Sequence, residues 1–225
     1  METIVISLGG SLIVPDNIDV DFLKEFKALV LAKVEKGKKF VIITGGGRLC
    51  RKYNDVAKEL GKPTNEDLDW IGIASLRLNA ELLRIIFEKY AYREVVSNLT
   101  ESFSSDKPII IGSAYKPGWS SDWNAVQAAK TIGAKKVINM SNIDYVYDSD
   151  PKVNPNAKKI EKISWAEYRK LIPAEWNPGL NSPFDPVASK VAEEAGIEVA
   201  FTNSKPIDNL AKCLNGEDFA GTIIK

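Results

Sequence analysis

The sequence contains no histidine among its 225 residues. This absence excludes histidine general bases, histidine metal ligands and every serine–histidine catalytic triad. Cysteine is scarce as well, because Cys50 and Cys213 are the only two and they form no CxxC pair. We therefore expect reduced, partly buried thiols, as in a cytoplasmic protein, and no disulfide framework.

Long apolar runs and an excess of one charge are also missing. No stretch approaches the roughly 20 apolar residues that a membrane-spanning helix needs, and the first residues have the pattern of a strand rather than of a signal peptide. Thirty basic residues balance thirty acidic ones. We expect a cytoplasmic protein with no nucleic-acid and no membrane partner. Affinity for a phosphorylated ligand would have to come from local geometry.

What the sequence does contain is a pair of glycine turns, each after an apolar stretch. Gly9-Gly10 with Ser11 follows residues 3–8, and Gly45-Gly46-Gly47 follows residues 39–44. Bare backbone N–H groups at the start of a helix bind phosphate, whereas a simple turn would need only one glycine. The repetition of this device favours two phosphate groups approached from two sides, which is the geometry of phosphoryl transfer.

Strand and helix patterns alternate along nearly the whole chain. This order predicts a single α/β domain with a central, mostly parallel sheet sandwiched by helices and with ligands at the carboxyl ends of the strands. The predicted strands cover residues 3–8, 39–44, 93–97, 107–111, 135–141, 197–202 and 222–224. The predicted helices cover residues 19–36 and 48–60, a long helix capped by Asn65 or Asp67 that runs to about Tyr90, a helix capped by Ser121 or Asp122 that runs to Ile132, and residues 164–171, 186–195 and 206–214.

Neither glycine turn is a Walker loop or a GxGxxG fingerprint. The motifs instead resemble those of the amino acid kinase family, and within it the archaeal-type uridylate (UMP) kinases. The resemblance covers essentially the whole chain, and its most specific part is DWIGIASLRLNAELL at residues 69–83. The other matching segments are VISLGGS at 5–11, TGGGRLCRKY at 44–53, PGWSSD at 117–122, NIDYVYDSDP at 142–151 and DPVASK at 185–190.

The resemblance implies an ATP-dependent nucleoside monophosphate kinase that transfers the γ-phosphoryl group of ATP to UMP, giving UDP and ADP in pyrimidine nucleotide synthesis. It also implies Mg²⁺ bound mostly through the ATP phosphates, and a homohexamer built from dimers. Residues 1–225 would form one amino acid kinase domain. Its acceptor-binding part would cover about 1–120 and its ATP-binding part about 121–225.

The first glycine turn would bring backbone N–H groups and the Ser11 hydroxyl to the ATP phosphates. Ser11 and Lys190 are the predicted catalytic residues, although Lys190 without the resemblance would be taken for a surface lysine. Arg51 could clamp a phosphate or lie on a solvated helix face, and Tyr147 could bind the nucleoside or only pack. The residues assigned to ATP are Ser7, Leu8, Gly9, Gly10, Ser11, Gly46, Arg51, Ser141, Asn142, Tyr147 and Asp150.

The second glycine turn and the loop after residue 112 would bind UMP. Asp69 could accept hydrogen bonds from the ribose hydroxyls or only complement the dipole of a helix start. The loop 115–121 would cover the uracil and the acceptor phosphate, or form an ordinary Pro-Gly turn with a serine cap. The residues assigned to UMP are Gly45, Asp69, Tyr115, Lys116, Pro117, Gly118, Trp119, Ser120 and Ser121, and no residue is assigned to a metal.

Three residues depart from the family pattern. Ser7 stands where many members have lysine, Tyr145 replaces a glycine and would be costly at a positive φ, and Trp119 is bulky for its loop. Trp176, in the irregular stretch 172–183, could stack on a base or only pack. Two alternatives therefore stay open: a related kinase with another small phosphate or carboxylate acceptor, and a non-catalytic nucleotide- or anion-binding protein on the same scaffold. The isoprenoid-phosphate branch of the family relies on a histidine, so its absence argues against that branch.

Overall fold

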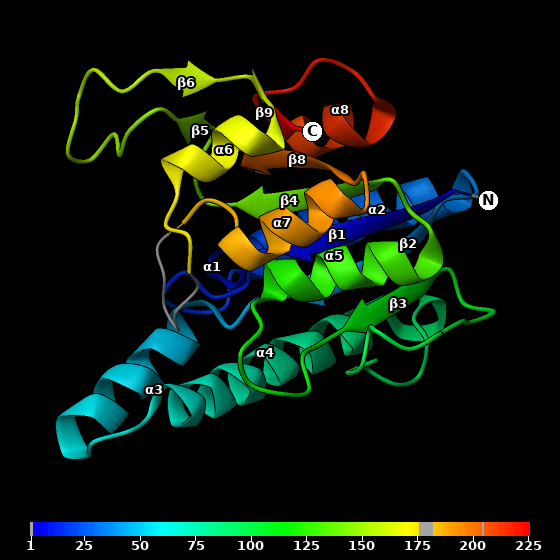
Figure 1. Cartoon of the computed structure of the whole chain (residues 1–225). Coiled ribbons are helices and arrows are strands. Elements are labelled where there is room, and N and C mark those ends of the chain that lie inside the picture. Colours follow the sequence, from blue (N-terminus) through cyan, green and yellow to red (C-terminus); the bar gives the residue numbers. More distant parts are fainter. Residues whose placement is uncertain (1, 176–181, 204) are drawn as a thin grey trace.

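The computed structural model describes residues 2–175, 182–203 and 205–225 (Figure 1). Trp176 lies outside the described residues, so its two interpretations both stay predictions. The main sheet has seven strands, and its middle joins the two halves of the chain. In sheet order they are β3 (Ile109–Gly112), β2 (Lys39–Thr44), β1 (Thr3–Leu8), β4 (Lys136–Ser141), β8 (Glu198–Asn203), β9 (Gly221–Ile224) and β7 (Lys162–Ile163).

The pairing of the strands confirms the predicted sheet. The strands from β3 to β8 run parallel to their neighbours, and β9 alone pairs antiparallel, with β8. β7 is parallel to β9. A second, two-stranded antiparallel ribbon consists of β5 (Val146–Tyr147) and β6 (Lys159–Ile160). No strand was predicted here from the sequence, because each of these strands has just two residues.

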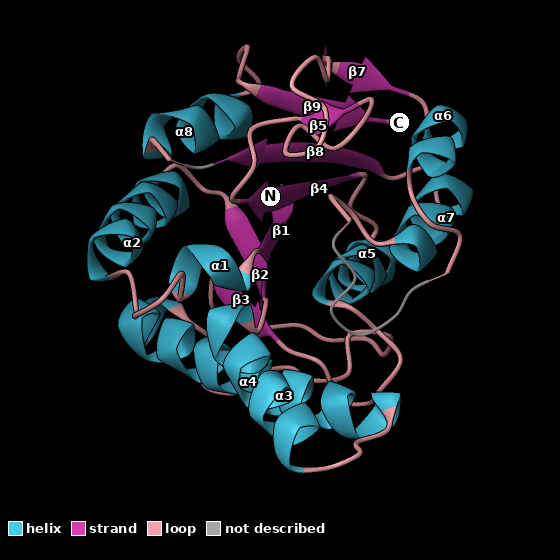
Figure 2. Ribbon diagram, turned by 90° about the vertical axis from the view of Figure 1, so that its left-hand side faces the viewer, coloured by secondary structure: helices cyan, strands magenta, loops and turns pink. Residues whose placement is uncertain are grey.

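Helices cover both faces of the sheet, as Figure 2 shows for α2 and α8 on one side and α5 and α7 on the other. The strands alternate between two apolar cores: Ile4, Ile6 and Leu8 pack into one, and Val5 packs into the other. The first core is covered by α1 (Gly10–Ile13), α2 (Val20–Glu35), α4 (Asn65–Phe87) and α8 (Ile207–Asn215). The second is covered by α5 (Ser121–Ile132), α6 (Trp165–Leu171) and α7 (Pro186–Glu194).

Two long helices extend beyond the sheet. α3 (Gly47–Leu60) packs on the first part of α4, and Figure 1 shows both projecting from the body of the domain. α3 has no buried residue. No helix of the described ranges is long and apolar enough to cross a bilayer.

Several predicted boundaries were wrong at helix ends. Thr64, rather than Asn65 or Asp67, caps α4, because its hydroxyl accepts from Asp67 N and the Asp67 carboxylate accepts from Thr64 N in return. α4 ends at Phe87, and a 3₁₀ turn, η1 (Glu88–Tyr90), follows. Ser120, rather than Ser121 or Asp122, caps α5 by accepting from Trp123 N at 3.1 Å. The Asp122 carboxylate is thereby left for other partners.

The predicted strand at residues 93–97 was also wrong. The chain touches the edge of β3 only through isolated bridges at Ala91 and Val96. Tyr92 N donates to Ile109 O at 2.8 Å and Val96 N donates to Ile111 O at 2.9 Å. A turn between these two contacts prevents a continuous ladder, although the β-rich composition is that of a strand.

The two glycine turns meet backbone to backbone at the carboxyl ends of β1 and β2. A Cβ atom on Gly10 would lie 2.1 Å from Gly47 N, and one on Gly45 would lie 2.6 Å from Gly10 N. Gly47 has a φ of +68°, a conformation that side chains disfavour. Asn79 of α4 donates to Gly45 O at 2.8 Å and holds the second turn in place. Glycine is therefore required here for close approach as well as for the turn itself.

We predict that Gly10→Ala lowers the free energy of unfolding by about 3 kcal/mol, because an added methyl group must push the two turns apart. Gly72→Ala is the matched control. Gly72 lies within α4, and its Cβ would meet only Cys50 Sγ of α3, at 3.8 Å. Alanine at this helical position adds up to about 1 kcal/mol. Urea unfolding of the two variants measures the difference, and equal stabilities would contradict the close contact of the turns.

Candidate functional site

A cavity of about 580 Å³ opens where the two glycine turns meet. One wall is formed by Ser11, Gly46 and Arg51, and the other by the loop that leads into α5. Its position at the carboxyl ends of parallel strands is the usual ligand site of such sheets. Ten of the predicted site residues line it: Ser11, Gly46, Arg51, Asp69, Lys116, Pro117, Trp119, Ser120, Ser121 and Asn142.

A second cavity, of about 370 Å³, lies beside the β5–β6 ribbon. It brings together four of the residues assigned to ATP, namely Ser141, Asn142, Tyr147 and Asp150. Apolar side chains such as Ile143, Leu171 and Ile172 complete a lining that suits a flat, partly apolar ligand. The two cavities share Asn142 and Lys152, so they are neighbours at one border.

Eight of the predicted residues line neither of these two cavities. Ser7 and Leu8 are buried beneath the first glycine turn, and Lys190 is exposed on α7 and lines neither cavity. The structure therefore does not bring Lys190 to the ligand space, and its catalytic role stays a prediction. Gly9, Gly10 and Gly45 shape the turns, while Tyr115 and Gly118 belong to the loop 115–121 that borders the first cavity.

Asp69 connects α4 to the loop 115–121. Its carboxylate accepts from Gly118 N at 2.7 Å, although the sequence suggested ribose hydroxyls as its partners. Burial raises the pKa of this carboxyl, and the hydrogen bond from Gly118 opposes the rise. One carboxylate oxygen thus holds the loop over the cavity. The other carboxylate oxygen has no donor among the described residues, and Asp69 lines the cavity, so this oxygen can accept a hydrogen bond from a ligand.

Trp119 fits its loop because it stacks on α5. Its ring lies 3.8 Å from the ring of Trp123 at an interplanar angle of 16°, and the ring of Tyr115 meets it edge-on at 5.6 Å. Lys116 Nζ lies 4.0 Å from the centroid of the Trp119 ring, in a cation–π contact. The large Trp119 side chain, which departs from the family pattern, therefore packs the loop against α5.

The backbone of Tyr145 does not adopt the positive φ that would be costly for a tyrosine. Among the described residues, Glu88 alone has a positive φ without being glycine. The Tyr145 ring lines the second cavity, stands edge-on to Tyr147 at 6.5 Å and lies 4.9 Å from Lys159 Nζ. The replacement of glycine thus adds an aromatic wall to this cavity.

Asp122 and Asp185 lie inside the matching motifs, but neither was predicted from the sequence to bind a ligand. The Asp122 carboxylate accepts from Ser7 Oγ at 2.9 Å, Asn139 Nδ2 at 2.7 Å and Asp185 N at 3.2 Å. Protein atoms surround this carboxylate even though the residue keeps some exposure. Burial first, and then the charge of Asp185, raise its pKa from 3.8 to about 7. The pKa of Asp185 is raised by burial too.

No group of three His, Cys, Asp or Glu residues in the described part of the chain could hold a metal ion by itself. Asp122 and Asp185 lie together near the first turn, but neither lines one of the two cavities, and both Asp122 oxygens already accept hydrogen bonds. The described residues therefore suit an ion such as Mg²⁺ that is held mostly by the phosphates of its ligand and by water.

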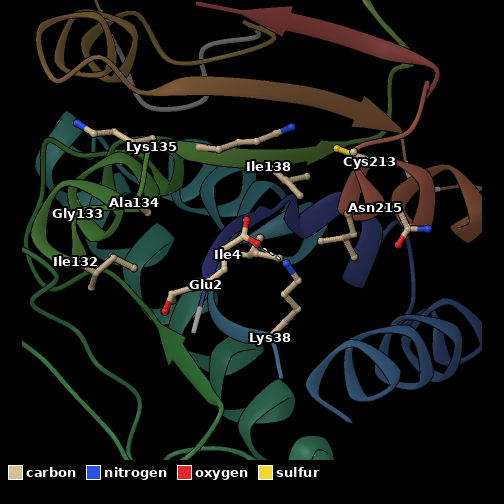
Figure 3. A pocket seen from close by; sticks show the side chains of 14 residues that line it. Glu2, Ile4, Lys38, Ile132, Gly133, Ala134, Lys135, Ile138, Cys213 and Asn215 are labelled. Atoms are coloured by element: carbon tan, nitrogen blue, oxygen red, sulfur yellow. Dashed lines mark hydrogen bonds and ion pairs between the residues drawn. The ribbon is translucent and has the colours of Figure 1, made fainter. Parts of the chain in front are cut away.

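A further cavity, of about 590 Å³, lies at the opposite, amino ends of the strands (Figure 3). Figure 3 shows Lys38 pointing towards Glu2, with which it forms an ion pair. Lys136 pairs with Glu198 at 3.5 Å. Helices end at this cavity with Gly133 and Gly216 in the left-handed conformation, so lysines here complement helix C-termini. No site residue predicted from the sequence lies there.

The fold and the paired cavities define the class: an α/β protein that offers two neighbouring ligand spaces at the carboxyl ends of a mostly parallel sheet. A family model described as the amino acid kinase family matches residues 2–203. The chain belongs to the amino acid kinase family.

Individual relatives agree with this assignment. The chain is 37% identical to a uridylate kinase of Staphylothermus marinus, over 99% of this chain and 98% of that protein. A solved uridylate kinase of Archaeoglobus fulgidus superimposes with a TM-score of 0.82 at 32% identity, and all of both chains is covered. An aspartate kinase of Synechocystis, at 16% identity and a TM-score of 0.73, shares the fold over 99% of this chain and 39% of that chain.

We predict that Asp122 makes the stability of the protein fall as the pH rises from about 4 to about 7. Its raised pKa means that the folded state holds a proton which the unfolded state releases near pH 4. The stabilisation is therefore complete below that pH and is lost as the pH passes the folded-state pKa. Chemical denaturation at pH 4 to 8 measures the slope, which should flatten in Asp122→Asn.

Asp55→Asn, at an exposed position of α3, is the control and should keep the wild-type slope. An Asp122→Asn protein with the same slope as the wild type would show that Asp122 is not the titrating group.

Proposed function

We propose that this protein is an ATP-dependent UMP kinase that forms UDP and ADP. The observation that carries the proposal is the pair of neighbouring cavities beside two contacting glycine turns. The full-length similarity to uridylate kinases supports UMP as the acceptor. ATP would take the cavity beside the β5–β6 ribbon, and UMP would take the cavity under the loop 115–121.

The reaction needs positioning and charge stabilisation more than covalent chemistry from the protein. An oxygen of the UMP phosphate attacks the γ-phosphorus of ATP, a P–O bond forms, and the bond from that phosphorus to the bridging oxygen breaks. ADP leaves with the electron pair, and no protein proton is consumed. The N–H groups of Gly46 and Gly47 and the Ser11 hydroxyl, which line the first cavity, are suited to bind the oxygens that gain charge. Mg²⁺ held mostly by the ATP phosphates would neutralise phosphate charge.

The division of labour follows the two parts of the chain. Asp69 and the loop 115–121 would hold UMP within the part over about 1–120. Arg51 was assigned to ATP from the sequence, but it lines the cavity proposed for UMP, so its role here would be to bind the UMP phosphate. Asn142, Tyr147 and Asp150 would hold ATP within the part over about 121–225. Such a reaction belongs to pyrimidine nucleotide synthesis in the cytoplasm.

We predict that MgATP and UMP give ADP and UDP, and that CMP, dCMP, AMP and GMP react at least about 100-fold more slowly, because a hydrogen-bonding site rejects a mismatched base strongly. A coupled assay of ADP release, with each acceptor offered separately, measures this. Turnover with another acceptor would keep the kinase and replace the substrate. ATP binding without turnover of any acceptor would contradict the kinase and leave a nucleotide-binding protein.

We also propose self-association through α3, in line with the homohexamer that the family resemblance implies. Tyr53, Val56 and Leu60 are 61%, 52% and 81% exposed along one side of this helix. Charges of both signs flank them, at Lys52, Asp55, Lys58 and Glu59. Two antiparallel copies of α3 would bury the apolar side chains and bring opposite charges together, as a twofold interface requires.

We predict that Val56→Asp lowers the mass measured by light scattering, because a buried carboxylate without a partner opposes association. The wild-type mass should be a multiple of 24.8 kDa. Val153→Asp is the control, since Val153 is 82% exposed on the loop between β5 and β6. A wild-type mass of one chain would contradict self-association, and an unchanged mass of Val56→Asp would exclude α3 as the interface.

A further inference from the structure

One basic side chain lies at the border between the two cavities. Arg51 and Lys116 line the first cavity only, whereas Lys152 lines both the first and the second. No other basic residue of the described chain lines both of these spaces. A group that passes from a ligand in one cavity to a ligand in the other must cross the border where Lys152 lies.

The backbone at Lys152 is held by its own loop. Lys152 N donates to Asp150 Oδ1 at 2.9 Å. The base of the loop is closed because Asp148 N donates to Lys158 O at 3.1 Å and Lys158 N donates to Asp148 Oδ1 at 2.9 Å. The loop therefore presents Lys152 from a fixed point, and its long flexible side chain can reach the border.

The positive charge of Lys152 is also not neutralised by a neighbouring carboxylate. No carboxylate of the described residues lies within ion-pair distance of it. By contrast, Arg48 pairs with Asp16 at 3.0 Å, and Lys116 lies over Trp119. The first strand offers only the neutral Ser7, which donates to Asp122. The negative charge of a phosphoryl group in transit has to be met by a cation from elsewhere.

We propose that Lys152 is a catalytic residue that contacts the oxygens of the γ-phosphoryl group during its transfer. The proposal rests on the proposed kinase function, because it takes the donor to lie in one cavity and the acceptor in the other. The bond to the ADP oxygen breaks and the bond to the acceptor oxygen forms while the ammonium stays protonated and neutralises charge. Asp150 acts as a positioning residue, because its carboxylate holds the backbone of Lys152.

The test compares Lys152→Met with Lys158→Met in steady-state kinetics with MgATP and UMP. Lys158 is exposed on the same loop and lines neither cavity, so its variant controls for loop stability and surface charge. We expect kcat of Lys152→Met to fall about 100-fold, the usual effect of removing one preorganised donor. KM for both substrates should stay within about threefold, and Lys152→Arg should recover part of kcat because it keeps the charge.

Calorimetric titration of ATP into Lys152→Met supplies a readout that is independent of turnover, and we expect its affinity to equal that of the wild type. An unchanged kcat would overturn the proposal. So would a loss confined to ATP affinity, because it would make Lys152 a ground-state binding group.

The kinetics of the wild type separate the two proposals. If the wild type uses UMP and Lys152→Met keeps its kcat, only the role of Lys152 fails. If the wild type uses another acceptor, the choice of UMP fails and the two variants are compared on that acceptor. If the wild type transfers phosphate to no acceptor, the kinase function fails, and the role of Lys152 fails with it.

Discussion

The main steric constraint in the molecule is the contact between the two glycine turns. Gly10 and Gly47 approach so closely that a single methyl group has no room, and Asn79 fastens the second turn from α4. This contact directly follows the last paired residues of β1 and β2, Leu8 and Thr44. Ser11 of the first turn and Gly46 and Gly47 of the second line the ligand space, and backbone N–H groups at such helix starts bind phosphate without a concentration of basic residues. The balanced charge of the chain is thus compatible with a phosphotransferase.

The charged groups near the turns include two carboxylates, Asp122 and Asp185, which the glycine motifs alone do not indicate. Ser7 is a neutral donor to Asp122, and Asp122 faces Asp185. Burial makes both carboxylates costly to ionise, the charge of Asp185 adds to the cost for Asp122, and neither has an ion-pair partner among the described residues, so a proton on Asp122 compensates. The basic side chains around the ligand spaces, Arg51, Lys116 and Lys152, all come from helices and loops outside the sheet.

Much of the fold could be predicted from the sequence, because long apolar strands and amphipathic helices carry clear periodicity. β1, β2, α2 and α3 lie where the pattern placed them. The sequence could not separate the true caps of α4 and α5 from their neighbours, since several adjacent residues can cap a helix. It also missed the β5–β6 ribbon, whose strands are too short for periodicity. At the site, glycines and motif residues were found, whereas the Asp122 network and the position of Lys152 depend on contacts between distant segments.

The proposed reaction requires that donor and acceptor occupy the neighbouring cavities at the same time. The most direct measurement is the binding of a bisubstrate analogue, an adenosine and a uridine joined by five phosphates. Joining two ligands of adjacent sites adds their binding free energies and removes the cost of one association. We predict that one analogue binds per chain, at least about 100-fold more tightly than ATP or UMP alone. An analogue that binds no more tightly than ATP, or competition between ATP and UMP for one site, would contradict it.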